Sequence, residues 1–475
     1  MSRAARWLYS AVTWAAQPLL RRKLRRRAVA EPGYGQWVDE RFGRYAEHGT
    51  VSPCNAPAQG ALVWIHAVSL GETRAAAILL PALRQQWPGM RLLLTHGTAT
   101  GRAEGQKLLQ PGDLQVWQPW DTRGAVARFL RQFRPAVGIL METEVWPNLI
   151  AACRARGIPL VLANARLSAK SLRQARRMAW LARPAYAALA AAWAQTEDDA
   201  VRLRSLGAPV QGVFGNLKFD IVPDAAQLAQ GRQWRAASPR PVVLLASSRE
   251  GEEAMWLQYF KPNRPPAHAG QALEAIKTEA NAGRKTPGAL EVQWLIVPRH
   301  PQRFGAVAEL LERAGLRVAR RSQWGAGPPD TAADTRADVW LGDSLGEMAL
   351  YYGLADVALL GGSFAPLGGQ NLIEAAACGC PVVLGPHTFN FAEAAELACA
   401  AGAALRVANL EEGIATACNL AHGGQPLATA RSHALQFAVA HRGAAHRTAV
   451  AIVALATVPA GAKAVAPSPS ERGLG

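Results

Sequence analysis

The segment Gly361–Glu374 carries residue types suited to binding a nucleotide. Its sequence, GGSFAPLGGQNLIE, has two glycine-rich turns followed by a predicted helix start with Asn371 and Glu374. A predicted strand, Asp356–Leu360, leads directly into the first glycines. Free backbone N–H groups and the positive end of a helix dipole at such a turn favour an anion, and Glu374 could accept hydrogen bonds from ribose hydroxyls. The segment therefore indicates a nucleotide-sugar site, with a ligand-free strand-to-helix turn as the alternative.

Acidic residues follow two other predicted strands, where they could transfer a proton. Glu72 ends the sequence Ser69–Glu72 at a predicted helix start. A carboxylate there either stabilises the helix dipole or, in a cleft, removes a proton from an attacking hydroxyl. Glu142 and Glu144 follow a predicted strand and precede Trp146. Two carboxylates at a strand end beside a Trp favour a functional role for at least one of them.

Basic residues at further strand ends could bind an anionic substrate. Arg166 and Arg299 each follow a predicted strand, and arginine suits phosphate recognition. Lys218 lies near the predicted domain junction, where it either faces the ligand or is a solvated surface lysine. Gly342–Glu347 repeats the strand–glycine–helix pattern, so its backbone could line a nucleotide base.

Metal binding is not predicted. His300 and His387 have no second nitrogen or sulfur ligand at coordinating spacing, and Cys378 and Cys380 are separated by a single residue. We expect buried free thiols, which indicate a reducing cytoplasm, at all six cysteines: Cys54, Cys153, Cys378, Cys380, Cys399 and Cys418.

Short apolar segments alternate with helical patterns on both sides of a polar segment, which predicts an α/β fold with parallel sheets covered on both faces. The strands expected in the first half are Ala61–Ile65, Arg91–Thr95, Val137–Leu140, Leu160–Ala163 and Ala192–Gln195. Those expected in the second half are Val242–Ala246, Trp294–Val297, Val339–Leu341, Val357–Leu360 and Val382–Leu384. Two doubly wound domains would leave a cleft between their facing strand ends, where two substrates can meet.

This pattern sets the expected domain boundaries. The first domain spans residues 31–222, a proline-containing linker spans 223–241, and the second domain spans 242–457. We expect a surface insertion at about 261–291 and a disordered tail at 458–475, because their compositions lack apolar periodicity.

The N-terminal residues 1–30 have the composition of a membrane-surface anchor. Trp7–Leu20 is apolar but shorter than the roughly 20 residues that a transmembrane helix needs. The basic run Arg21–Arg27 follows it, which suits an anionic membrane leaflet. A true span and a plain core helix are the alternatives. The formal net charge of +17 also favours anionic partners, but the basic run has no interleaved aromatic residues to stack on RNA.

Seven ordered motifs resemble the bacterial 3-deoxy-D-manno-octulosonic acid (Kdo) transferase family of lipid A biosynthesis. They are HAVSLGE, METEVWPNLI, LANARLS, GNLKFD, VPRHPQRF, GDSLGEM and GGSFAPLGGQNLIEAAACGCPVVLGPHTFNF. The resemblance covers about residues 7–420 without the insertion, and it implies a GT-B glycosyltransferase with two Rossmann-like domains facing a central cleft. It further implies transfer of Kdo from CMP-Kdo to lipid IVA, without a metal or other cofactor, at the cytoplasmic side of the inner membrane.

The resemblance also assigns roles to residues of this chain. Glu72 matches the general base that deprotonates the acceptor hydroxyl, and Glu142 and Lys218 match residues of transition-state stabilisation. The residues that match three CMP contacts are Pro298 and Arg299; Leu345, Gly346 and Glu347; and Asn371, Leu372, Ile373 and Glu374. Direct attack by the acceptor would invert the anomeric centre.

The chain departs from the family pattern at Leu367 and Leu372, where a His and a Pro are frequent, and at His96, where Thr is usual. Arg249 replaces the His of a His-Glu-Gly-Glu-Glu motif, which leaves that donor contact open. A GT-B enzyme using a UDP- or GDP-sugar is the nearest alternative. A dinucleotide-dependent oxidoreductase is disfavoured because no G-x-G-x-x-G follows a first strand, and a non-catalytic RNA- or membrane-binding protein is the third alternative.

Overall fold

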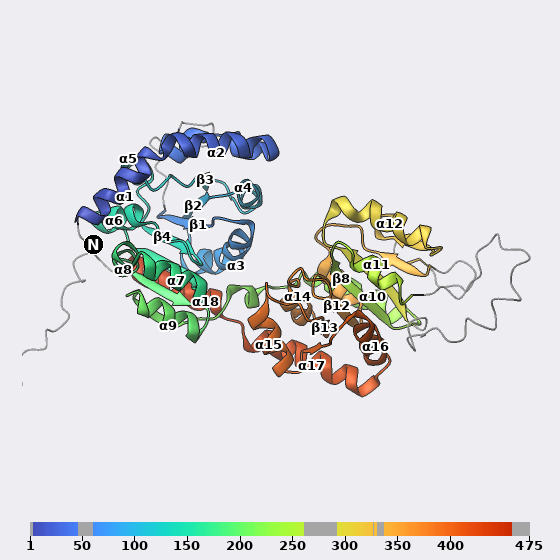
Figure 1. Cartoon of the computed structure of the whole chain (residues 1–475). Coiled ribbons are helices and arrows are strands. Elements are labelled where there is room, and N and C mark those ends of the chain that lie inside the picture. Colours follow the sequence, from blue (N-terminus) through green and yellow to red (C-terminus); the bar gives the residue numbers. More distant parts are fainter. Residues whose placement is uncertain (1–2, 46–59, 261–291, 326, 330–336, 458–475) are drawn as a thin grey trace, which may run out of the picture. The chain divides into compact units, whose positions relative to one another are not determined.

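The computed structural model describes residues 3–45, 60–260, 292–325, 327–329 and 337–457. The chain forms two compact units (Figure 1). The first contains Met1–Asp220 together with Arg442–Gly475, and the second contains Ile221–His441. The expected insertion at 261–291 and tail at 458–475 lie outside the described residues.

The first unit is built on a parallel seven-stranded sheet with the order β3-β2-β1-β4-β5-β6-β7. Its strands are β1 (Leu62–His66), β2 (Arg91–His96), β3 (Leu114–Trp117), β4 (Val137–Met141), β5 (Leu160–Ala165), β6 (Ala191–Ala194) and β7 (Val210–Val213). The strand order reverses direction between β1 and β4. In open α/β sheets such a reversal opens a crevice at the carboxyl ends of the two strands, where ligands bind.

Helices cover both faces of this sheet. They are α3 (Leu70–Gln86), α4 (Ala99–Gln106), α5 (Arg123–Phe133), α6 (Pro147–Ala155), α7 (Ala169–Arg177), α8 (Ala179–Tyr186), α9 (Glu197–Ser205) and α18 (Ala444–Thr457), with short 3-10 turns η1 (Pro32–Gly35), η2 (Val38–Phe42) and η3 (Leu217–Asp220). Many begin where a hydroxyl side chain caps the first turn, which satisfies one unpaired N–H group. These caps are Ser69, Thr98, Thr122, Ser168 and Thr196.

The second unit repeats the architecture, with the strand order β10-β11-β9-β8-β12-β13-β14. Its strands are β8 (Val242–Ser248), β9 (Gln293–Pro298), β10 (Val318–Arg320), β11 (Val339–Leu341), β12 (Val357–Leu360), β13 (Val382–Leu384) and β14 (Ala404–Arg406). Here the order reverses between β8 and β12. The helices are α10 (Ala225–Ala237), α11 (Glu252–Leu257), α12 (Phe304–Arg313), α13 (Met348–Leu354), α14 (Leu372–Ala377), α15 (Ala392–Ala400), α16 (Leu410–Ala421) and α17 (Gly424–Ala440), with 3-10 turns η5 (Pro301–Arg303) and η6 (Arg321–Gln323).

The sequence pattern located the central strands of both sheets and missed the edges. All ten predicted strands are present, and no end differs by more than two residues, because central strands are buried on both faces and are continuously apolar. The missed strands β3, β7, β10 and β14 lie at sheet edges, where the residues are only partly buried and the apolar signal is weak. The two Rossmann-like units confirm the predicted fold class, whereas the predicted cleft between them stays a prediction.

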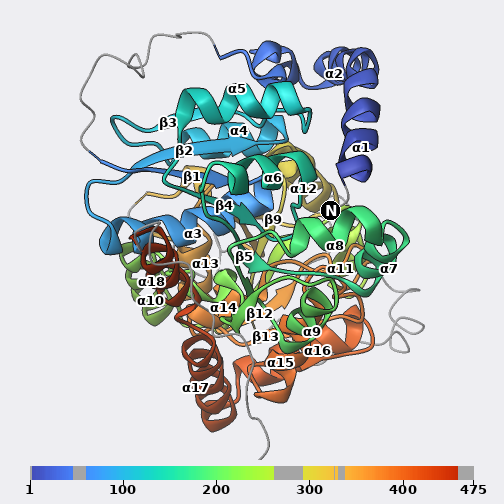
Figure 2. The ribbon, with the colours of Figure 1, turned by 90° about the vertical axis from the view of Figure 1, so that its left-hand side faces the viewer.

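Two expected domain boundaries differ from the structure. Residues 223–241, expected as the interdomain linker, belong to the second unit, where most of them form α10 and pack against α13. The boundary at 457 also differs, because α18 returns to the first unit and packs against α3 (Figure 2). The buried residues of α18 include Ala444, Ala449 and Ile452. The Asp220 carboxylate accepts hydrogen bonds from the backbone N–H groups of Gly443 and Ala445 at the start of this helix.

The N-terminal residues form two helices, α1 (Arg3–Ala15) and α2 (Gln17–Ala30). α1 contacts α6 and α8, and the Ser10 hydroxyl donates to Asn148 Oδ1 at 3.0 Å. Among the described residues, no helix combines the length and apolar character that crossing a membrane requires. The expected membrane association of this segment stays a prediction.

Candidate functional site

Glu72 lies in the first turn of α3, directly after β1 and beside the point where the first sheet reverses its order. Its carboxylate accepts a hydrogen bond from the Val68 backbone N–H at 2.7 Å, and the Ser69 hydroxyl accepts from the Glu72 N–H at 3.4 Å. This arrangement resembles a capping box, except that the Glu72 carboxylate accepts from Val68, the residue before the N-cap Ser69. The capping role that the sequence allows is therefore real, and it also fixes the position of the carboxylate.

The electrostatic setting of Glu72 suits a proton acceptor. The pKa of Glu72 is raised to about 8, mainly by burial and in smaller part by the negative charges of Glu142 and Glu144. Burial also raises the pKa of Glu144 above its ordinary value. A general base works best when its pKa lies near the operating pH. Two carboxylates that follow β4 thus act electrostatically on Glu72, which follows β1.

Glu142 and Asn164 occupy strained backbone positions at the ends of neighbouring strands. Their φ angles are 58° and 52°, in the left-handed region that residues other than glycine rarely adopt. The Glu142 N–H donates to the Ala163 carbonyl at 3.0 Å, which holds the strand end in place. Such strain persists where the surrounding structure enforces it, often at functional sites.

Asn164 connects this strand end to the segment that carries Lys218. Its side-chain oxygen accepts a hydrogen bond from the Leu217 N–H at 3.1 Å, while its buried side-chain nitrogen has no hydrogen-bond partner among the described residues. Leu217 and Lys218 belong to η3, which contacts α3. The three predicted catalytic residues, Glu72, Glu142 and Lys218, therefore all belong to the first unit. The elements next to them are connected, because α3 contacts η3 and β1 pairs with β4.

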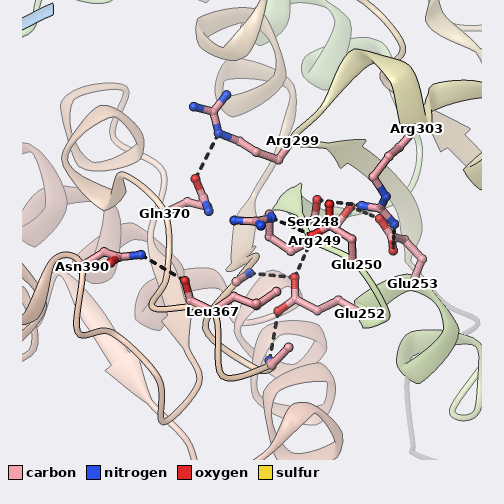
Figure 3. A network of polar contacts seen from close by, with 12 residues as sticks. Ser248, Arg249, Glu250, Glu252, Glu253, Arg299, Arg303, Leu367, Gln370 and Asn390 are labelled. Carbon is pink, nitrogen blue, oxygen red and sulfur yellow. Dashed lines mark hydrogen bonds and ion pairs between the residues drawn. The ribbon is translucent and has the colours of Figure 1, made fainter. Parts of the chain in front are cut away.

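In the second unit, the glycine-rich loop after β12 is held by a carboxylate. Glu252 is fully buried, and it accepts hydrogen bonds from the N–H groups of Gly362 at 2.7 Å and of Phe364 and Ala365 at 3.2 Å (Figure 3). The Arg249 N–H donates to the same carboxylate at 2.8 Å. Burial raises the pKa of Glu252, and these N–H groups oppose the shift by stabilising the ionised form.

This arrangement corrects one expectation. The sequence pattern predicts loop N–H groups that are free for a phosphate, but Gly362, Phe364 and Ala365 donate to Glu252, and Gly361 donates to the Ala246 carbonyl. Glu252 was not predicted to shape the site. The available signal was a carboxylate close after the strand Val242–Ser248, at the start of α11.

Arginines at the same strand ends are the better candidates for an anion. Arg299 follows β9, and its Nε donates to Gln370 Oε1 of the glycine-rich loop at 3.1 Å (Figure 3). Arg249 follows β8 and pairs with Glu250 at 2.9 Å. Behind them, Arg303 forms an ion pair with the buried Glu253 at 2.7 Å, and Glu253 accepts from the Ser248 hydroxyl at 2.6 Å.

The residues predicted to contact the donor at α14 divide into two groups. Asn371 caps the helix by accepting from the Ile373 N–H at 3.2 Å, and Glu374 lies in its first turn; both are half-buried. Leu372 and Ile373 are buried in the core, as is Pro298 at the end of β9. Burial raises the pKa of Tyr352, and among nearby charges Glu374 raises this pKa while Arg299 lowers it.

The third predicted contact, Leu345–Glu347, lies in the turn before α13. Gly346 has a φ angle of 81°, which glycine adopts without strain, and Leu345 is 73% exposed. Glu347 pairs with Arg321 at 2.9 Å and accepts from the Ser344 hydroxyl. An exposed apolar side chain on a fixed turn could pack against a nucleotide base.

No group of three or more His, Cys, Asp or Glu residues that could hold a metal ion occurs within the described ranges. Cys153, Cys378, Cys380 and Cys418 are buried free thiols and Cys399 is partly buried, while Cys54 lies outside the described residues. Metal independence stays a prediction.

Comparisons with known proteins agree on one family. Residues 36–221 match the family described as 3-deoxy-D-manno-octulosonic-acid transferase (kdotransferase). A 3-deoxy-D-manno-octulosonic acid transferase from Bordetella pertussis is 47% identical over 422 residues, which cover 87% of this chain and 91% of the relative. The chain belongs to the Kdo transferase family. The same transferase from Haemophilus influenzae is 33% identical over 392 residues, covering 82% of this chain and 84% of the relative.

Membership in the Kdo transferase family confirms the resemblance carried by the seven motifs and makes the chain a glycosyltransferase of lipopolysaccharide biosynthesis. A solved glycosyltransferase from Rickettsia africae shares the fold, with a TM-score of 0.51 and 10% sequence identity over 84% of this chain and 100% of that chain. Two parallel seven-stranded units of this kind constitute the GT-B fold.

Proposed function

We propose that the enzyme transfers Kdo from CMP-Kdo to lipid IVA with inversion, and that Glu72 is the general base. The observation that carries this proposal is the position of Glu72 at the switch point of the first sheet, with burial raising its pKa to about 8. Membership in a transferase family supports transfer of the sugar to an acceptor, whose nucleophile in this proposal is a hydroxyl. Glu72 is the buried carboxylate best suited to remove that proton.

The proposed reaction is a single displacement. The acceptor oxygen attacks the anomeric carbon of Kdo while Glu72 takes the hydroxyl proton, and the bond from that carbon to the CMP phosphate breaks. Positive charge develops on the sugar and negative charge on the departing phosphate. Glu142 stabilises the first and Lys218 the second.

The second unit supplies the donor site in this proposal. Arg299 binds the CMP phosphate, as the bidentate geometry of a guanidinium favours. Glu374 accepts from the ribose hydroxyls, and the turn Leu345–Glu347 packs against the cytosine.

We also propose that the N-terminal helices bind the cytoplasmic face of the inner membrane. Apolar side chains of α1 and α2 are exposed, with exposed fractions of 62% for Trp7, 71% for Trp14 and 68% for Leu19. Basic side chains of α2 are also exposed, namely Arg22, Lys23, Arg25, Arg26 and Arg27. Exposed apolar and basic groups together favour an anionic lipid surface.

Transfer is tested with CMP-Kdo and lipid IVA, with the product detected by mass spectrometry. Wild type and Glu104→Gln, a control on α4 whose carboxylate pairs with Lys107, should give a lipid whose mass is raised by Kdo, whereas Glu72→Gln should not. Transfer from a UDP- or GDP-sugar but not from CMP-Kdo would overturn the donor assignment. CMP binding without transfer to lipid IVA would overturn the acceptor assignment.

Membrane binding is tested by flotation with vesicles that contain anionic phospholipid. Trp14→Gln combined with Leu19→Gln should weaken flotation, because both side chains are exposed and their loss leaves the core unchanged. Val439→Gln, at a position on α17 that is 62% exposed, is the matched control and should float like wild type. Equal flotation of all three proteins would place the membrane contact elsewhere.

A further inference from the structure

A second charged cavity lies in the second unit, at the end of β12 opposite the glycine-rich loop. Its volume is about 470 Å³, within the range of roughly 300–1,000 Å³ that is typical of small-molecule sites. Asp356, which lines it, directly precedes β12, whereas the glycine-rich loop directly follows β12. The cavity and the loop therefore lie at opposite ends of this strand.

Three arginines line this cavity, which we call the arginine pocket: Arg232 and Arg235 from α10 and Arg431 from α17. Among the described residues that line it, the acidic one is Asp356. Arg235 and Arg431 pair with the Asp356 carboxylate at 2.5 and 2.6 Å, and Arg232 donates to the Cys378 carbonyl at 3.3 Å. The cavity lining thus contains three guanidinium groups and one carboxylate.

The Asp356 carboxylate already has partners within the protein. It is almost fully buried and also accepts a hydrogen bond from the Val242 N–H at 2.8 Å. Its pairing with Arg235 and Arg431 explains how α10 and α17 are attached to the strand. This attachment does not require Arg232, whose contact is with a neutral carbonyl, and it leaves an excess of two positive charges along the cavity wall.

The chemistry of these side chains defines the ligand. Each guanidinium has five N–H donors in a planar fork that matches the oxygens of phosphate. Arg232 is exposed and Arg431 is 41% exposed, so both remain open to a solute. We propose that the arginine pocket binds a doubly charged oxyanion of the phosphate or phosphomonoester class, independently of the donor site.

Binding is measured by calorimetry on the full chain with inorganic phosphate and with glycerol phosphate, against chloride at matched ionic strength. Phosphate should bind the wild type and also raise its melting temperature. Arg232→Gln should weaken binding about tenfold or more, because a charge-assisted hydrogen bond is lost. This variant leaves both ion pairs of Asp356 in place, so it tests binding without removing the attachment of α10 and α17.

Two further arginine variants locate the anion. Arg313→Gln changes an exposed arginine on α12 that pairs with Glu309, and it should bind phosphate like wild type. Arg299→Gln changes the proposed donor site, so it should retain the phosphate binding that Arg232→Gln weakens. Loss of binding in Arg299→Gln would assign the anion to the donor site, and equal affinity in wild type and Arg232→Gln would likewise overturn the proposal. Tighter binding of glycerol phosphate than of inorganic phosphate would identify the ligand as an organic phosphomonoester.

Discussion

The carboxylate of Glu252 accepts a hydrogen bond from the backbone N–H of Gly362 at 2.7 Å, although the two residues are 110 positions apart in the sequence. The strand order explains this contact, because β8 and β12 are neighbours in the sheet and their carboxyl ends carry Glu252 and the glycine-rich loop. The conformation of the glycine-rich loop is therefore fixed before a donor binds. Preorganisation of this kind lowers the entropic cost of binding.

Replacement of Glu252 by Gln should weaken CMP binding about tenfold or more and lower the free energy of unfolding by about 1–3 kcal/mol. The amide keeps the shape of the side chain but places an NH₂ group against backbone donors. Calorimetry with CMP and urea denaturation measure the two effects. Glu309→Gln, on the exposed surface of α12, is the control. Unchanged CMP affinity in Glu252→Gln would show that CMP binding does not depend on the hydrogen bonds between Glu252 and the glycine-rich loop.

Replacement of Glu72 by Gln should lower kcat by a factor of about 100–10,000, the usual contribution of general base catalysis. CMP affinity should stay near that of wild type, because the base acts in the chemical step and belongs to the first unit. Steady-state kinetics and CMP titration separate the two. An equal loss in CMP affinity would assign Glu72 to substrate binding instead.

The rate should also report the pKa of Glu72. Because the base must be ionised and burial raises its pKa to about 8, kcat/KM should rise with pH and level off above about pH 8. A pH profile of kcat/KM for the wild type between about pH 6 and 10 measures this rise. A rate that is already flat across the acidic half of that range would contradict the assignment of Glu72 as the base.

The same pKa makes a prediction about stability. Since burial raises the folded-state pKa of Glu72 from 4.5 to about 8, its favourable contribution is complete below pH 4.5 and is lost as the pH rises through 8. Glu72→Gln cannot ionise, so its melting temperature relative to wild type should increase between about pH 5 and pH 9. Glu104→Gln should not share this trend, because a hydrogen bond from Lys107 lowers the pKa of Glu104. A constant difference for Glu72→Gln across this range would contradict the raised pKa.

Asn164 offers a test of backbone strain at the first site. Asn164→Ala removes the hydrogen bond to the Leu217 N–H and places an alanine at a φ angle of 52°, which costs roughly 1–2 kcal/mol in addition. Asn164→Gly removes the bond without the steric penalty. Urea denaturation should therefore rank the glycine variant above the alanine variant in stability. The reverse order would show that the strain is relieved by a local rearrangement.

The central strands, the α/β class and most of the candidate site can be predicted from the amino-acid pattern. Val137–Met141 is continuously apolar because it is buried on both faces, and Ser69 and Glu72 have the spacing of a capping box. Both signals are local, since they depend on residues within one element or one turn. The seven ordered motifs are local in the same sense, and their order along the chain is enough to indicate the family.

Relations between distant segments follow only from the tertiary structure. Nothing in the local pattern indicates that Glu252 occupies the N–H groups of the glycine-rich loop, or that α18 returns to the first unit. The raised pKa of Glu72 likewise depends on burial and on charges from the end of β4. Such contacts follow from strand order and helix packing, which make neighbours of residues that are far apart in the chain. Local periodicity reflects only residues within one element, so it does not predict these contacts.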